Sequence, residues 1–207
     1  MKISVILSYL MITVTSSSLA QNAYISLGRQ AVLDGDFKKA VLHLEKACVI
    51  DSTNANALWM LGYSYYHNES YKKAIAAYNR AISLKPGDCW AYYYRARAKN
   101  YLAKDNSTPA GDKEKFLLGS IVDFTKAIDI NPSDMKFYQN RGIAYRDYGI
   151  FKLQPGAKSN DRARGINSLK ASISDLEKVL ADNPSRSDIE ALLSLSKEKL
   201  ATAVGHH

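Results

Sequence analysis

Small and apolar residues recur along the chain at the spacing of a helix face. Tyr24, Leu27, Gly28 and Ala31 stand at positions i, i+3, i+4 and i+7, which places them on one side of an α-helix. An Asp-Gly-Asp break at 34–36 ends this pattern. A second amphipathic pattern follows at Phe37, Ala40, Leu44 and Ala47. The pattern therefore predicts two helices joined by a tight turn.

The same pattern returns 34 residues later. Leu61 and Gly62 repeat Leu27 and Gly28 at this offset. Ala74 and Ala81 repeat Ala40 and Ala47 in the same way. A shared offset of this length is typical of stacked helical repeats, in which each helix pair buries its apolar face against its neighbours. We therefore predict an all-α chain built from antiparallel helix pairs.

The third and fourth units delay their second helix. Pro132 follows Pro86 by 46 residues and Pro184 follows Pro132 by 52, so both spacings exceed the 34-residue period. We expect a loop at 104–112 with the next helix extended backwards over 113–118, and a second loop around 151–160 before a helix that begins near Asp161. The predicted units are 21–54, 55–88, 89–134 with an insertion, 135–186 with an insertion, a capping helix at 187–203 and a tail at 204–207.

The later units also depart from the pattern inside their first helices. Arg95 and Arg141 stand where the first two units have leucine. Ser120 and Ser172 replace the small alanine of the second helix. Because the stem of an arginine can cover apolar surface while its head stays in water, we expect both arginines to be tolerated there.

The first two units resemble the tetratricopeptide repeat family. The resemblance covers residues 21–88 and is carried by Leu-Gly, Tyr65, the two alanines of each second helix and Pro86 in a 34-residue frame. It implies an α-α superhelix of about four helix-turn-helix repeats plus a capping helix. It also implies a non-catalytic scaffold that binds a protein or peptide segment in the concave groove formed by the first helices.

Candidate binding residues lie one position away from the packing face of the first helices. Aromatic and arginine side chains carry much of the binding energy at protein interfaces, and arginine can hold a carboxylate through paired hydrogen bonds. Packing between repeats could instead cover the rings, and internal salt bridges could engage the arginines. The predicted ligand-binding or peptide-binding residues are Trp59, Tyr63, Tyr66, Trp90, Tyr94, Arg97, Asn100 and Arg146.

Reactive clusters are missing from the sequence. It has no glycine-rich phosphate loop, no His-Glu-x-x-His and no Cys-x-x-Cys. His43 and His67 have no companion at metal-ligand spacing. We therefore expect no enzyme, no catalytic residue, no metal and no cofactor. Two functions remain as alternatives to protein binding: a glycan or cell-wall fragment bound by the aromatic residues, and a structural subunit of an envelope complex. Residues of the kind that bind a chaperone's C-terminal carboxylate are not present in the required set.

The first twenty residues have the layout of a secretory signal peptide. Lys2 precedes an apolar run, and small residues lead to Ala20. The run is shorter than a bilayer span. We expect cleavage after Ala20, export to the periplasm or secretion, and no membrane span in the mature chain.

The net charge of +8 then falls by the one lysine removed, and its basic sign is poor evidence for a nucleic-acid partner. Cys48 and Cys89 are expected to be small packed side chains, with a disulfide between them as the minority alternative.

Overall fold

The computed structural model describes residues 19–155 and 159–205. The predicted leader therefore lies outside the described residues except for Leu19 and Ala20. Within the described ranges the secondary structure is helical and contains no strand. The predicted all-α class is confirmed. The chain divides into two compact units, Met1–Pro86 and Gly87–His207, and each is described by itself.

The first unit contains two helix pairs. Residues 19–33 are helical, followed by α2 (Phe37–Ile50), α3 (Ala55–His67) and α4 (Tyr71–Leu84). Asp36 and Asn54 cap α2 and α3, because their side chains accept hydrogen bonds from the backbone N–H groups of Lys39 and Ala57. These caps explain why the acidic and amide residues of the sequence breaks mark helix starts.

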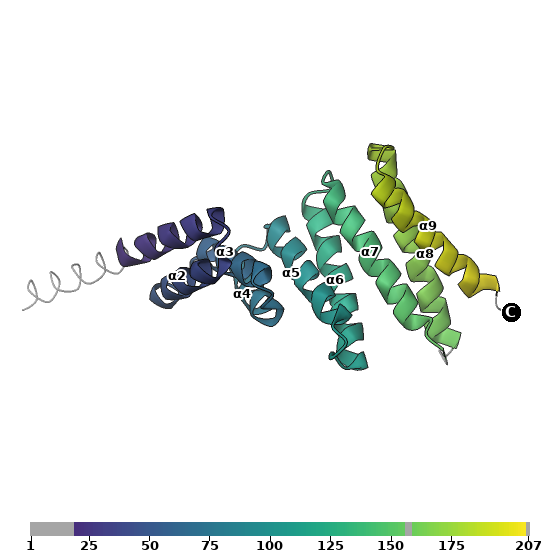
Figure 1. Cartoon of the computed structure of the whole chain (residues 1–207), viewed down its shortest axis with the longest axis horizontal. Helices are drawn as coiled ribbons and strands as arrows, with labels where there is room; N and C mark the ends of the chain where they lie inside the picture. Colours follow the sequence, from purple (N-terminus) through teal and green to yellow (C-terminus); the bar gives the residue numbers. More distant parts are fainter. Residues whose placement is uncertain (1–18, 156–158, 206–207) are drawn as a thin grey trace, which may run out of the picture. The chain divides into compact units, whose positions relative to one another are not determined.

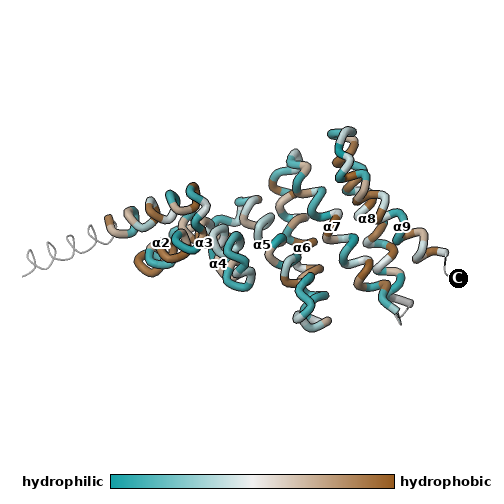
Figure 2. The backbone as a smooth tube through the Cα atoms, in the orientation of Figure 1, coloured by the Kyte–Doolittle hydropathy of each residue, from teal (hydrophilic) through white to brown (hydrophobic). Residues whose placement is uncertain are grey.

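The second unit is a row of helices in which each packs against the next (Figure 1). Its elements are α5 (Cys89–Lys104), α6 (Ala110–Ile130), α7 (Met135–Lys152), α8 (Ser159–Asp182) and α9 (Ser187–Gly205). Asp88 and Asp134 cap α5 and α7 through backbone N–H groups of the first turn. Figure 2 shows polar and apolar stretches alternating along these helices, as helices with one buried face require. Among the described residues, no helix is long and apolar enough to span a bilayer.

Glycines allow the helices of a pair to approach closely. A Cβ on Gly62 would lie 2.9 Å from Cε1 of Tyr78, a ring that is fully buried. In the second unit, a Cβ on Gly149 would lie 3.0 Å from the carbonyl oxygen of Gly165. A Cβ on Gly165 would likewise lie 3.0 Å from the carbonyl oxygen of Gly149. Gly62, which marks the repeat in the sequence, is therefore a contact point between paired helices, and so are Gly149 and Gly165 in the second unit.

The inserted residues are mostly helical, which corrects the predicted loops. α5 continues to Lys104 and α6 already begins at Ala110, so 105–109 connect them. α7 continues to Lys152, and α8 begins at Ser159, two residues before the expected start; residues 156–158 lie outside the described part. The added turns have partners: Nζ of Lys152 lies 2.7 Å from Oε1 of Glu114 and 3.1 Å from Oδ1 of Asp161. These ion pairs connect the extension of α6 with those of α7 and α8.

The ends of the chain differ from the expected pattern. Leu27 is 48% exposed although its counterpart Leu61 is buried. Leu61 lies on α3, which packs against α2, whereas no described helix precedes the one that carries Leu27. At the other end, α9 extends to Gly205, two residues beyond the predicted end of the capping helix. Cys48 is buried, Cys89 is half-buried, and both are free thiols.

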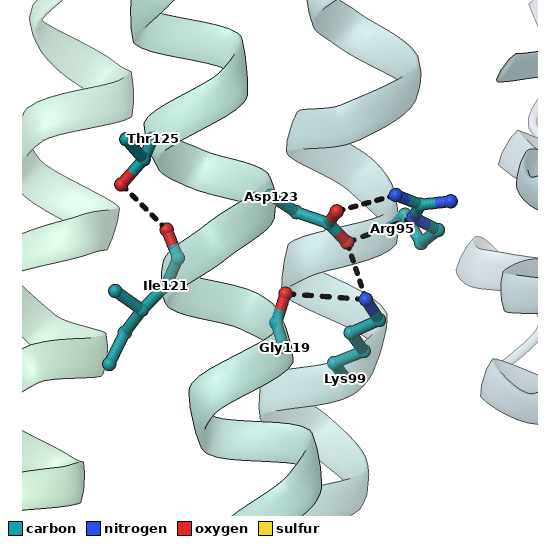
Figure 3. A network of polar contacts seen from close by, with 6 residues as sticks. All are labelled: Arg95, Lys99, Gly119, Ile121, Asp123 and Thr125. Carbon is teal, nitrogen blue, oxygen red and sulfur yellow. Dashed lines mark hydrogen bonds and ion pairs between the residues drawn. The ribbon is translucent and has the colours of Figure 1, made fainter.

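Arg95 and Arg141 do not extend into water as predicted; each pairs with a buried aspartate on the next helix. Nε and Nη2 of Arg95 donate to the two carboxylate oxygens of Asp123 at 2.9 and 2.5 Å. Nζ of Lys99 donates to the same carboxylate at 2.7 Å and to the carbonyl oxygen of Gly119 at 3.2 Å (Figure 3). The paired geometry satisfies charges that would otherwise be costly to bury.

Candidate interaction surfaces

The predicted aromatic residues of α3 form a ring stack in the first unit. The rings of Trp59 and Tyr63 lie 5.4 Å apart at an interplanar angle of 11°. Tyr63 in turn lies 4.3 Å from the ring of His67, which stacks on Phe37 at 4.5 Å. Trp59 and Tyr63 are half-buried. Together they present flat apolar area that is partly open to solvent.

Tyr66 does not share this exposure. Only 5% of Tyr66 is exposed, and its ring contacts the rings of His67 and Tyr71 edge-on. Tyr66 therefore packs within the unit, as the alternative interpretation of the sequence allowed. The part of the predicted α3 surface that solvent can reach is Trp59 and Tyr63.

A second surface runs along one side of α5. Trp90 contacts Tyr94 at 6.3 Å between ring centroids and Phe137 of α7 at 5.2 Å. The ammonium of Lys136 lies 5.8 Å from the centroid of the Trp90 ring. The members of this surface are spaced by three or four residues and therefore share one helix face. We call it the α5 stripe; it consists of Trp90, Tyr94, Arg97, Tyr101 and Lys104.

The C-terminal part of the α5 stripe borders a small hollow. The guanidinium of Arg97 lies 5.6 Å from the ring centroid of Tyr93. Burial raises the pKa of Tyr93, and the positive charge of Arg97 partly offsets this. Nδ2 of Asn140 donates to the hydroxyl of Tyr93 at 3.4 Å and to the carbonyl oxygen of Lys136 at 2.8 Å. The hollow has a volume of about 150 Å³ and is lined by Arg97, Asn100, Tyr101, Lys104, Asn140 and Ile143.

Arg146 lies close to this hollow but is engaged internally. Its Nη2 donates to Oδ1 of Asp147 at 3.0 Å, and its side chain is 12% exposed. Oδ2 of Asp147 lies 3.1 Å from Nζ of Lys104. The internal ion pair that the sequence left open is therefore formed at Arg146, and Arg97 and Lys104 are the cations that border the hollow.

Sequence reasoning missed part of this site. Lys104 falls within the predicted loop at 104–112, and Asp147 is not among the predicted residues. Continuing the spacing from Trp90 through Tyr94, Arg97 and Tyr101 leads to Lys104, so the helical period could have found this lysine. Asn100, which was predicted, is buried at 9% exposure beside the hollow.

The described residues show no arrangement suited to a metal. No group of three or more His, Cys, Asp or Glu side chains gathers there. The hollow beside α5 is also smaller than the roughly 300–1,000 Å³ typical of small-molecule and cofactor sites. What the two surfaces offer is aromatic area, cationic groups and amides.

Family models match the first part of the chain. Residues 55–88 match the model described as Tetratricopeptide repeat, and residues 22–69 match one described as TPR repeat. Residues 22–88 are therefore similar to tetratricopeptide repeats. Such repeats typically mediate protein interactions and are generally non-catalytic scaffolds. A curated relative, Superkiller protein 3 of Schizosaccharomyces pombe, is 34% identical over 73 residues, and the match spans 35% of this chain and 5% of that protein.

Solved structures extend the likeness to the second unit. MamA 41-end from Desulfovibrio magneticus RS-1 is similar with a TM-score of 0.67 at 15% identity, covering 90% of both chains. A thermophilic TPR protein from Thermus thermophilus has a TM-score of 0.52 at 16% identity, covering 85% of this chain and 98% of that one. The C-terminal part of a TPR repeat-containing protein from Cytophaga hutchinsonii has a TM-score of 0.55 at 20% identity. That match covers 85% of this chain and 61% of the other. Identities this low show a shared tetratricopeptide repeat fold alone.

Proposed function

We propose that this chain is a non-catalytic scaffold that binds another protein or a peptide through the first helices of its repeats. The observation that carries the proposal is the half-exposed aromatic area on α3 and α5, where Trp59 stacks on Tyr63 and Trp90 contacts Tyr94. Tryptophan and tyrosine bury much area at little entropic cost when a partner binds. The tetratricopeptide repeats of residues 22–88 support the same class of function.

The experiment isolates a partner and then removes the rings. The mature chain captures proteins from extracts of its source, and each candidate is purified and titrated by calorimetry. Trp59→Ala and Trp90→Ala are expected to weaken binding of a true partner by about tenfold or more each. Val122→Ala is the matched control, because Val122 is a 66% exposed apolar residue on α6.

The proposal fails if both tryptophan variants bind the purified partner as tightly as the parent while circular dichroism shows unchanged helicity. A loss of binding that Val122→Ala reproduces equally would also contradict it, because the aromatic surfaces would then have no special role.

Glycan binding is a second candidate, favoured by the near-parallel rings of Trp59 and Tyr63. Flat stacked rings offer an apolar face that a sugar ring can cover. Titration of soluble cell-wall fragments while following tryptophan fluorescence tests it, since Trp59 and Trp90 are the two tryptophans of the chain. A saturable change lost in Trp59→Phe supports the glycan. An unchanged spectrum rejects it.

A third arrangement, a structural envelope subunit, predicts a large assembly when the purified chain is sedimented with extract.

We also infer that the chain is exported after removal of residues 1–20. Lys2, the apolar run and the small residues before Gln21 support this inference. N-terminal sequencing of the protein isolated from its source is expected to begin at Gln21. A chain that begins at Met1 in its final compartment would contradict export by this signal.

A further inference from the structure

The hollow between α5 and α7 differs chemically from the aromatic end of the α5 stripe. Two of its lining residues, Arg97 and Lys104, are cationic, and its lining contains no acidic side chain. Asp147 lies next to it and reaches Lys104 at 3.1 Å. The lysine of that pair is still half exposed, with 53% of its side chain open to water. An anion entering the hollow would therefore meet two positive groups.

Asn100 supplies the second observation. The residue is only 9% exposed, and its Oδ1 is buried without a hydrogen-bond partner in the described structure. A buried acceptor left unpaired costs roughly 1–3 kcal/mol, so most such atoms are matched by a donor. Because Asn100 lines the hollow, an N–H group on a bound molecule can provide that donor.

The hollow continues the aromatic surface rather than standing apart from it. Trp90, Tyr94, Arg97 and Lys104 lie along one face of α5, so a segment that covers the tryptophan can extend along the helix to the two cations. α7 carries on past the hollow to Lys152. A bound segment can therefore contact helix surface both before and after the hollow. This favours a side chain in the middle of a segment over the terminus of a peptide as the group that enters the hollow.

We propose that this hollow binds the carboxylate of an aspartate or glutamate side chain within an extended peptide segment of the partner. The carboxylate accepts hydrogen bonds from Arg97 and Lys104, and a backbone N–H of the same segment donates to Oδ1 of Asn100. This assignment rests on the proposed function, since it names the chemistry of the partner at the α5 stripe. The small volume of about 150 Å³ admits one such side chain.

Short fluorescent peptides test the assignment by anisotropy. The probe alternates glutamate with alanine and has an acetylated N-terminus and an amidated C-terminus; its match has glutamine in place of glutamate. We expect the glutamate peptide to bind the parent chain about tenfold more tightly than the glutamine peptide. The double variant Arg97→Gln/Lys104→Gln should remove that preference. Asn100→Leu should weaken both peptides, because it removes the acceptor for the backbone.

Charge alone could attract an acidic peptide to a basic chain, so the control removes the same charge elsewhere. Lys115→Gln/Lys170→Gln lowers the net charge equally at two exposed positions on α6 and α8 and should leave the preference intact. Three results would overturn the proposal: an equal loss in this control, no saturable binding of the glutamate peptide, or about tenfold tighter binding when the peptide has a free C-terminus and no glutamate.

The native partner separates this proposal from the proposed function. If Trp90→Ala abolishes partner binding while Arg97→Gln/Lys104→Gln leaves it unchanged, the carboxylate site is wrong and the scaffold stands. If neither variant nor Trp59→Ala affects binding, the proposed function itself is wrong.

Discussion

Arg141 and Asp175 are joined by two parallel hydrogen bonds between α7 and α8, from Nε to Oδ2 and from Nη2 to Oδ1, each 2.8 Å long. Arg95 and Asp123 form the same pair one repeat earlier. At the corresponding positions the second repeat has Leu61 and Ala77, both buried. The two positions have therefore changed together, from an apolar pair to an ion pair.

The first prediction concerns this exchange. Asp175→Ala leaves the largely buried guanidinium of Arg141 without its carboxylate and should lower the free energy of unfolding by about 3–5 kcal/mol. The double variant Arg141→Leu/Asp175→Ala recreates the pair of the second repeat and should recover most of this loss. Urea denaturation of the three proteins measures both effects. A double variant as unstable as Asp175→Ala would contradict the equivalence of the two pairs.

The second prediction concerns a close contact between α7 and α8 in the second unit. Gly149→Ala places a methyl group 2.9 Å from Cγ of Leu169 and 3.0 Å from the carbonyl oxygen of Gly165. It should lower the free energy of unfolding by about 1–3 kcal/mol. Gly111→Ala on α6 is the control, because a Cβ there has nothing within 4 Å. It should leave stability unchanged or raise it by up to about 1 kcal/mol. Equal effects in thermal denaturation would show that the α7–α8 contact is not tight.

The third prediction concerns alkaline pH. The hydroxyl of Tyr65 donates to Oε1 of Glu45, and burial together with this carboxylate raises the pKa of Tyr65 well above its usual value. The folded state then holds the phenolic proton more tightly than the unfolded state, whose tyrosine titrates near 10. The stabilisation is thus complete below about pH 10 and is lost as the pH rises further.

Urea midpoints measured from pH 8 upwards check this. Tyr65→Phe should show a shallower alkaline decline than the parent. Tyr24→Phe, which removes a hydroxyl from a half-buried tyrosine of the helix at residues 19–33, should decline as the parent does. Identical slopes in Tyr65→Phe and the parent would exclude Tyr65 as the source of the loss.

The fourth prediction concerns the two thiols. Cys48 is buried and Cys89 is half-buried, and burial raises the pKa of both thiols. Because the thiolate is the reactive form, both should react slowly with a disulfide reagent at neutral pH, with Cys89 faster than Cys48. Unfolding in guanidinium should make the rates converge. Faster reaction of Cys48 in the folded chain would contradict its burial.

The repeat pattern was enough to predict the helix pairs, because a 34-residue offset fixes which residues face each other. Gly62 against Tyr78 is a contact of this kind. The ion pairs of Arg95 and Arg141 do not follow from the two arginines alone. They follow when both partner positions are compared, because Leu61 faces Ala77 in the second repeat and Arg95 faces Asp123 in the third.

The candidate surfaces were predicted in part. Helical spacing identified Trp59, Trp90 and Arg97, but it could not tell which rings the fold buries. Tyr66 packs inside the unit because Tyr71 and His67 meet it there. The hollow required knowledge of which residues of α5 and α7 face each other, and that depends on the length of the helical insertions.

The measurement that tests the central claim most directly is ¹⁹F NMR of the chain labelled with 5-fluorotryptophan. The sequence contains two tryptophans, so two resonances are expected, and Trp59→Phe and Trp90→Phe assign them. If the first helices form the binding surface, addition of the purified partner should shift or broaden at least one resonance in a saturable way. Partner binding that is complete by calorimetry while both resonances stay unchanged would show that the partner binds elsewhere on the chain.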